Sequence, residues 1–167
     1  MRRVLVVASI FVAVQHAQAL SAPQPASLGA LAVAYHAGDF ARVRALPLAA
    51  LEKRTRVPDY LAYFVAEACL LDGKYDEAER RFALLGKKFP RFAVRARAGE
   101  ADAAWRAGHR AIALKLYGEL ARSADKSIDQ AVVHTRLAEG LQSAPAHWRA
   151  VVIEQPNHPL ATPSVEA

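Results

Sequence analysis

Cysteine is almost absent from this chain, in which Cys69 is the only one. A single cysteine excludes an internal disulfide, so the fold must be held together by packing and polar contacts. Cys69 falls on the same face of a predicted helix as Leu61, Val65 and Ala68. We therefore expect a small buried hydrophobic side chain at this position rather than a reactive thiol.

Aromatic residues and strand-like patterns are also scarce. Aromatics make up only 8% of the residues although 53% are hydrophobic, because alanine supplies much of the apolar content. Alanine has the highest helix propensity, and its small side chain lets helices approach one another closely. Since the alternation of β-branched and polar residues that is typical of strands is rare, we predict an all-α protein.

Several patterns that would indicate catalysis or nucleic-acid binding are missing. The chain has no glycine-rich phosphate loop, and its acidic residues stand singly or on charged helix faces. The formal net charge of +6 comes from arginines interspersed with acids. A glycosidase needs two carboxylates across a cleft, and a nucleic-acid-binding protein shows clustered basic residues. We therefore predict no catalytic residues, no cofactor and no nucleic-acid partner.

The histidines offer no simple metal site. Beyond the N-terminal segment, no two histidines stand three or four residues apart, so no single helix face presents a pair of imidazole ligands. His36 and His109 lie beside predicted turns, where we expect solvated side chains. His134, His147 and His158 all fall in the last predicted unit. A zinc site formed by the folding of that unit is the alternative to our prediction that no metal is bound.

The N-terminus has the pattern of a secretory signal peptide. Arg2 and Arg3 precede the almost wholly apolar run 4–14, and Ala17-Gln18-Ala19 has the small residues that signal peptidase recognises. We expect cleavage after Ala19, which makes residues 1–19 the signal peptide and places the mature chain in the periplasm or outside the cell, without a membrane span. An uncleaved anchor is the alternative, but the apolar run is shorter than the roughly 20 residues of a transmembrane helix. Residues 20–25 form a proline-containing linker.

Three glycines recur at an even spacing. Gly38, Gly73 and Gly108 are 35 residues apart, and similar phrases follow them at 39–41, 74–78 and 109–113. Glycine readily takes the left-handed conformation that ends a helix, and a fixed period of this length is typical of arrays of antiparallel helix pairs. We predict about four such pairs over residues 26–156, followed by a disordered tail at 157–167.

The second unit shows this pattern most fully. Pro58 suits the first turn of a helix that ends at Gly73, and Pro90 ends the helix that follows. Between them runs a continuous apolar stripe, formed by Tyr75, Ala78, Phe82, Leu85 and Phe89. The first unit contains Pro47, where we expect a break. In the fourth unit we expect residues 140–145 to make the turn.

The third unit places charged residues along one helix face. These are Arg91, Arg95, Asp102 and Arg106. Our hypothesis is that this face binds a partner, either an acidic protein segment or an anionic wall polymer. The alternative is an ordinary solvated helix face.

The second unit resembles a tetratricopeptide repeat. The matching residues are Ala66, Gly73, Tyr75, Ala78, Phe82 and Pro90. The third unit matches through Ala101, Gly108, Ala113 and Tyr117, and the first through Leu31, Gly38 and Phe40. The resemblance implies a right-handed solenoid whose surface binds extended or helical peptides. The expected function is a non-catalytic scaffold for protein–protein interaction in the cell envelope.

The end of the chain resembles a second family. Residues 136–141, 148–152 and 156–161 are similar to the helical N-terminal region of soluble lytic transglycosylases, which are exported enzymes that cleave peptidoglycan. The catalytic acid of that family stands in a Glu-Ser dipeptide, and no Glu-Ser occurs in this sequence. The alternative function is therefore the helical part of such an enzyme, as a fragment that acts on peptidoglycan without the catalytic domain.

Overall fold

Helices supply the regular structure of this chain. The computed structural model describes residues 27–141, 145–154 and 156–161, so the predicted signal peptide and linker lie outside the described residues. The described residues form α-helices and one short 3₁₀ helix, with no strand among them, which confirms the all-α prediction. No helix within these ranges is long and apolar enough to cross a membrane.

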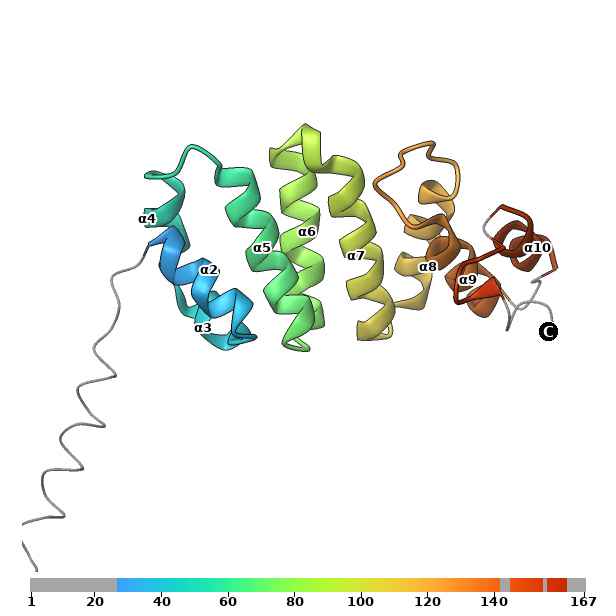
Figure 1. Cartoon of the computed structure of the whole chain (residues 1–167), viewed down its shortest axis with the longest axis horizontal. Helices are drawn as coiled ribbons and strands as arrows, with labels where there is room; N and C mark the ends of the chain where they lie inside the picture. The colour runs from blue at the N-terminus through green and yellow to red at the C-terminus, as the bar shows by residue number, and fades with distance from the viewer. Residues whose placement is uncertain (1–26, 142–144, 155, 162–167) are drawn as a thin grey trace, which may run out of the picture.

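The helices lie in a row that follows the order of the chain (Figure 1). The row begins with three short helices, α2 (Leu28–His36), α3 (Phe40–Ala45) and α4 (Leu48–Glu52). Its middle consists of α5 (Pro58–Leu71), α6 (Tyr75–Lys88), the 3₁₀ helix η1 (Pro90–Phe92), α7 (Ala93–Ala107) and α8 (Arg110–Leu120). It ends with α9 (Gln130–Leu141) and α10 (Pro145–Glu154).

Each helix from α5 to α10 packs mainly against its neighbours in the chain. The apolar core accordingly runs along the row as successive clusters, around Val65, around Phe82 and around Tyr117. All three of these side chains are at most 2% exposed. Cys69 is also fully buried, as predicted, and so are Ala78 and Ala113.

The three evenly spaced glycines end helices. Gly38, Gly73 and Gly108 have φ angles of 71°, 72° and 85°, in the left-handed region where a side chain would be strained. Each of them allows the chain to reverse between two helices. After Gly38, the carboxylate of Asp39 accepts a hydrogen bond from the backbone N–H of Arg42 at 3.0 Å and so caps α3.

The prolines also mark helix ends where the sequence predicts them. Pro47 stands between α3 and α4, and Pro58 is the first residue of α5. Pro90 begins η1, separated from the end of α6 only by Phe89. A proline has no backbone N–H, so it fits the first turn of a helix and interrupts the interior of one.

Two features of the last unit differ from expectation. Gly140 lies inside α9 rather than in a turn, and a Cβ placed on it would overlap the side chain of Leu114. This glycine therefore permits α9 to approach α8 closely. Residues 157–161, expected to begin a disordered tail, instead follow α10 closely enough for Ala161 to be buried against Ala131 and Val151. Residues 162–167 lie outside the described ranges.

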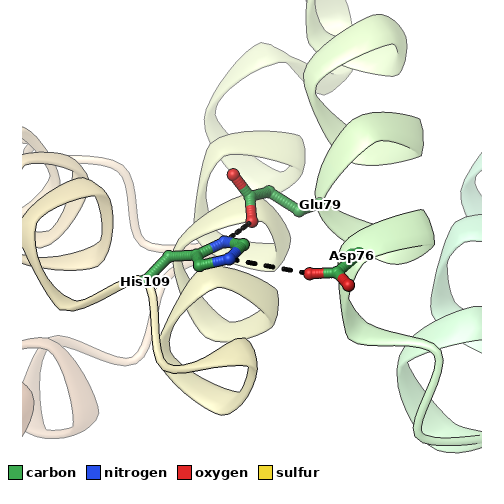
Figure 2. Close-up of side chains that lie close together, drawn as sticks. All are labelled: Asp76, Glu79 and His109. Atoms are coloured by element: carbon green, nitrogen blue, oxygen red, sulfur yellow. Dashed lines mark hydrogen bonds and ion pairs between the residues drawn. The ribbon is translucent and has the colours of Figure 1, made fainter.

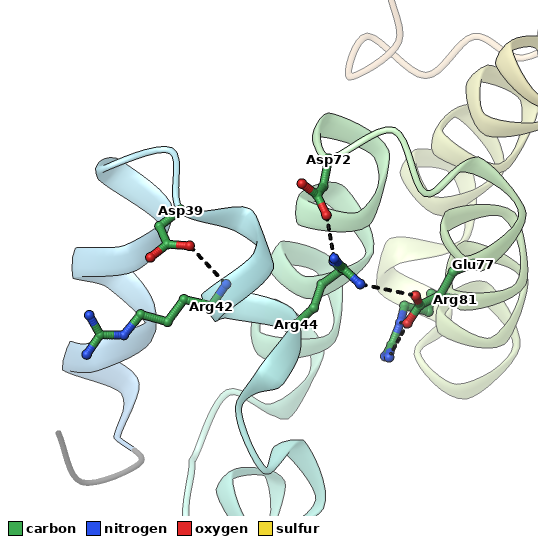
Figure 3. Close-up of polar contacts among 6 residues, drawn as sticks. All are labelled: Asp39, Arg42, Arg44, Asp72, Glu77 and Arg81. Carbon is green, nitrogen blue, oxygen red and sulfur yellow. Dashed lines mark hydrogen bonds and ion pairs between the residues drawn. The ribbon is translucent and has the colours of Figure 1, made fainter. Parts of the chain in front are cut away.

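A polar network joins α3 to the start of α6 (Figure 3). The guanidinium of Arg44 lies 2.5 Å from a carboxylate oxygen of Asp72 and 3.8 Å from one of Glu77. Glu77 also accepts hydrogen bonds from two guanidinium nitrogens of Arg81, at 2.9 and 2.7 Å. These bonds from Arg81 lower the pKa of Glu77. Glu77 and Arg81 are both half-buried, so this network is partly shielded from water.

Candidate functional site

The structure separates the four charged residues of the predicted partner face. Arg95 and Asp102 line one pocket between helices. Arg106, further along α7, lines a different pocket beside Asp76 and Arg80. Arg91 precedes α7, in η1. Arg95, Asp102 and Arg106 share α7, but their neighbours on other helices divide them between two pockets.

Arg91 forms an ion pair with Asp59, the second residue of α5. Asp59 is only 6% exposed, and a buried carboxylate requires a partner. The hydrogen bond from Arg91 lowers the pKa of Asp59. The guanidinium of Arg91 also lies 5.2 Å from the ring centre of Tyr60. We conclude that Arg91 fastens η1 to α5, which is a structural role.

A pocket of about 390 Å³ opens between α5, α7 and α9, and we name it the α5–α7–α9 pocket. One helix from each of three successive helix pairs contributes to its wall. The buried rings of Phe82 and Tyr117, from the intervening helices α6 and α8, also line it. The remaining lining residues are Tyr63, Glu67, Leu70, Arg95, Ala98, Gly99, Asp102, Ser127, Ile128, Asp129, Val132 and Val133.

Two acids of this pocket have hydrogen-bond partners within the protein. Asp102 accepts a hydrogen bond of 2.5 Å from the hydroxyl of Tyr117, and Glu67 accepts one of 2.6 Å from the hydroxyl of Tyr35. Burial, followed by the neighbouring carboxylate, raises the pKa of Tyr117. Burial likewise raises the pKa of Tyr35, so both phenols remain protonated donors that position the carboxylates.

Arg95 is the cation of the α5–α7–α9 pocket. Its side chain is exposed, and its guanidinium carbon lies 5.9 Å from the ring centre of Tyr63. At this distance a guanidinium is attracted to the face of an aromatic ring. The pocket thus combines apolar and aromatic walls with one exposed positive charge, that of Arg95, and three carboxylates.

A second group of polar side chains meets between α6 and α8 (Figure 2). His109, the residue before α8, has its Nδ1 2.8 Å from Oε2 of Glu79 and its Nε2 3.7 Å from Oδ1 of Asp76. The hydrogen bond with Glu79 raises the pKa of His109. We expected His109 to be solvated, whereas its imidazole lies between two carboxylates. Among the described residues, these three form the one cluster of three possible metal ligands.

The histidines of the last unit come together only in part. The Nδ1 atoms of His134 and His147 are 3.2 Å apart, which joins α9 to α10. His158 instead places its Nε2 3.1 Å from a carboxylate oxygen of Asp129. The three-histidine arrangement that we kept as an alternative is thus replaced by one histidine pair and one histidine–aspartate pair.

The sequence contained a signal for the His109 cluster that we did not use. His109 follows Gly108 as Lys74 follows Gly73, so the period of 35 makes the two turns equivalent. Equivalent turns of stacked repeats lie next to one another. This relation brings the start of α8 near the start of α6, where Asp76 and Glu79 stand.

Comparisons with known proteins give no further guidance. No protein-family model, curated protein or solved structure matches the chain. A function must therefore be argued from the residues themselves.

Proposed function

We propose that this chain is a non-catalytic, tetratricopeptide-like scaffold of the cell envelope that binds a peptide segment of a protein partner in the α5–α7–α9 pocket. The architecture supports the repeat assignment. Three glycine turns with positive φ recur every 35 residues, and helices that follow one another in the chain pack side by side. In our proposal these pairs form a right-handed solenoid.

The observation that carries the proposal is the composition of the pocket wall. Most of its residues come from α5, α7, α9 and the loop that leads into α9, and these three helices are the first of three successive pairs. A repeat array offers a continuous surface to an extended or helical peptide when the same helix of each pair faces the same way. A pocket shared by three such helices offers one bound segment contacts with three successive helix pairs.

The chemistry of the pocket indicates what that segment carries. Its apolar and aromatic wall residues, including Tyr63, Ile128 and Val132, favour an aliphatic or aromatic side chain. The charged wall residues are Arg95 and three acids, Glu67, Asp102 and Asp129. Arg95 favours a carboxylate on the bound segment, and the acids favour a basic group on the same segment. We therefore propose a peptide whose apolar anchor is flanked by one acidic and one basic side chain.

The N-terminal sequence pattern supports the proposed location of the protein in the cell envelope. A positive start, an apolar run and the Ala17-Gln18-Ala19 sequence are typical of a cleaved signal for general secretion. The proposed partner is therefore a protein of the periplasm or of the outer surface.

A binding comparison between two charge reversals tests this function. The purified protein is immobilised and exposed to an envelope extract, and captured proteins are identified by mass spectrometry. Arg95→Glu, within the pocket, should abolish capture of a specific partner. Arg80→Glu makes the same change at an exposed position of α6 outside this pocket and should leave capture intact. A synthetic peptide from the captured protein should then bind the wild type and displace that protein.

Two outcomes would contradict the proposal. Equal capture by both variants would show that binding does not involve the α5–α7–α9 pocket. Sedimentation of the wild type with purified, protein-free peptidoglycan, with no protein captured, would favour the peptidoglycan-binding alternative. A circular-dichroism spectrum of each variant controls for loss of the helical fold.

A further inference from the structure

The cluster of Asp76, Glu79 and His109 shares no residue with the α5–α7–α9 pocket. Each residue offers one possible ligand atom, and these three atoms all lie within 4.8 Å of one another. From this juxtaposition we propose that Asp76, Glu79 and His109 bind a divalent transition-metal ion of the Zn²⁺ type, which links α6 to the start of α8. The site is independent of the proposed peptide-binding function.

The distances between the possible ligand atoms are close to those around a zinc ion. Zinc lies about 2.0–2.2 Å from imidazole nitrogen and carboxylate oxygen, so two of its ligand atoms are roughly 3–3.5 Å apart. Nδ1 of His109 and Oε2 of Glu79 are 2.8 Å apart, so they need to separate only slightly around an ion on Nδ1. Oδ1 of Asp76 lies 3.7 Å from the other ring nitrogen, Nε2, so the Asp76 side chain must rotate to reach that ion. The carboxylate of Asp76 is 69% exposed and can turn toward an ion without displacing packed side chains.

The backbone holds two of the ligands on one surface and the third opposite them. Asp76 and Glu79 are three residues apart in α6, so they share a helix face. His109 directly follows Gly108, whose positive φ sets the direction in which the chain enters α8. Glu79 is only 17% exposed, which restricts its motion. The site therefore forms from positions that the fold has already placed.

The ligand set indicates the class of ion. One imidazole nitrogen with two carboxylate oxygens suits zinc, whereas magnesium and calcium prefer oxygen ligands alone. Three protein ligands leave room for water on the solvent side, as in open zinc sites. Three nearby cations oppose binding, because Lys74, Arg80 and Arg106 line the pocket beside Asp76. Replacing Arg106 by Gln should therefore tighten binding.

The other role open to this cluster is a plain hydrogen-bonded contact that fastens α8 to α6. Isothermal titration of the purified protein with Zn²⁺ at neutral pH distinguishes the two roles. We expect one zinc bound per chain, and no binding heat with Mg²⁺. His109→Gln and Glu79→Gln should each weaken zinc binding at least about tenfold, since even residues that merely support a metal ligand contribute about 10- to 100-fold.

Two control variants separate this site from the other histidines. His36→Gln alters the histidine beside the first glycine turn, and His134→Gln alters the pair with His147. Both should bind zinc as the wild type does. The proposal is overturned if the wild type binds no zinc, if His109→Gln binds it unchanged, or if His134→Gln alone abolishes binding. Circular dichroism of each variant confirms that the helices remain folded.

A spectroscopic readout strengthens the test without relying on affinity. In NMR spectra of the wild type, zinc should shift the imidazole signals of His109 and leave those of His36 unchanged. A shift confined to His134 and His147 would instead place the ion between α9 and α10 and would contradict the proposal.

Discussion

Two junctions in this molecule hold helices together by different means. Where α6 meets α7, the ring of Phe82 lies against Gly99, and Ala96 and Ala103 are fully buried in the same cluster. Where α3 meets α5 and α6, Arg44 reaches across to Asp72 and Glu77 (Figure 3). The first junction depends on shape, and the second depends on charge.

This difference indicates how much each junction contributes to the stability of the fold. At the α6–α7 junction there is no space for an added methyl group, because a Cβ on Gly99 would lie 2.6 Å from two ring carbons of Phe82. At the α3 junction, side chains that are 24–33% exposed interact partly through water, which weakens their attraction. We therefore expect the shape-dependent junction to tolerate substitution less well than the charged one.

The largest loss of stability is expected from Gly99→Ala. Phe82 is 2% exposed and packed in its cluster, so its ring can move away from the new methyl group only by giving up contacts there and shifting toward the pocket that it lines. Overpacking of this kind costs about 1–3 kcal/mol, and it should outweigh the gain of up to about 1 kcal/mol that alanine brings to a helix interior. Urea unfolding followed by circular dichroism measures the difference.

Gly118→Ala is the matched control for this prediction. Gly118 also lies inside a helix, α8, but nothing comes within 4 Å of a Cβ built on it. This substitution should stabilise the protein by about 0.5–1 kcal/mol. If Gly99→Ala were as stabilising as Gly118→Ala, the close approach of α6 and α7 would not limit stability. In a Phe82→Leu background, Gly99→Ala should cost less, because the smaller side chain leaves room.

A smaller effect is expected from Arg44→Met, which removes the charge but keeps an apolar side chain. The loss should be about 1 kcal/mol or less, because partly exposed ion pairs contribute little. Within the described residues, Nε of Arg44 is also buried without a hydrogen-bond partner. This costs free energy and offsets part of what the ion pairs of Arg44 contribute to stability. Urea unfolding at low and high salt measures the loss, which should decrease as salt screens the charges.

Arg54→Met makes the same change at an exposed residue just beyond α4. The free energy of unfolding should change by no more than about 0.5 kcal/mol, as for most surface substitutions. An Arg44→Met loss that matched that of Gly99→Ala, or that did not depend on salt, would show that the charged junction acts through packing instead.

The smallest effect at neutral pH is expected from Arg91→Gln, because Arg91 is 59% exposed and the amide of a glutamine can still donate a hydrogen bond to Asp59, which also accepts one from the backbone N–H of Tyr60. The hydrogen bond from Arg91 lowers the pKa of Asp59, so the folded protein binds fewer protons than the unfolded chain. The stabilisation is therefore complete above the unfolded pKa of about 3.9. It is lost as the pH falls through the lower folded pKa. The stability difference between wild type and variant should narrow over this acidic range.

Urea unfolding at a series of pH values tests this expectation. In an Asp59→Asn background the titrating carboxyl is gone, so Arg91→Gln should have an effect that no longer changes across the acidic range. The role assigned to the pair would be contradicted if the free energies of unfolding of the wild type and Arg91→Gln differed by the same amount at every pH while Asp59 was present.

The sequence alone determined the helices and where they end. Gly38, Gly73 and Gly108 stop helices because their own φ angles are positive. Pro47 and Pro90 also affect only the chain next to them, since each lacks a backbone N–H. The spacing of apolar residues in α6 correctly indicated that Ala78, Phe82 and Leu85 are buried. All of these features depend on residues within one or two helical turns, which a sequence displays directly.

Only the tertiary structure decided which distant side chains meet. Arg91 and Arg95 share a helical spacing, yet one contacts Asp59 and the other lines a pocket. His109 was expected in solvent but lies between two carboxylates of α6. Gly140 was expected in a turn, but its lack of a Cβ serves a contact with Leu114. Such partners are set by how helices pack at long sequence separation, and a residue's own neighbours in the chain do not encode that arrangement.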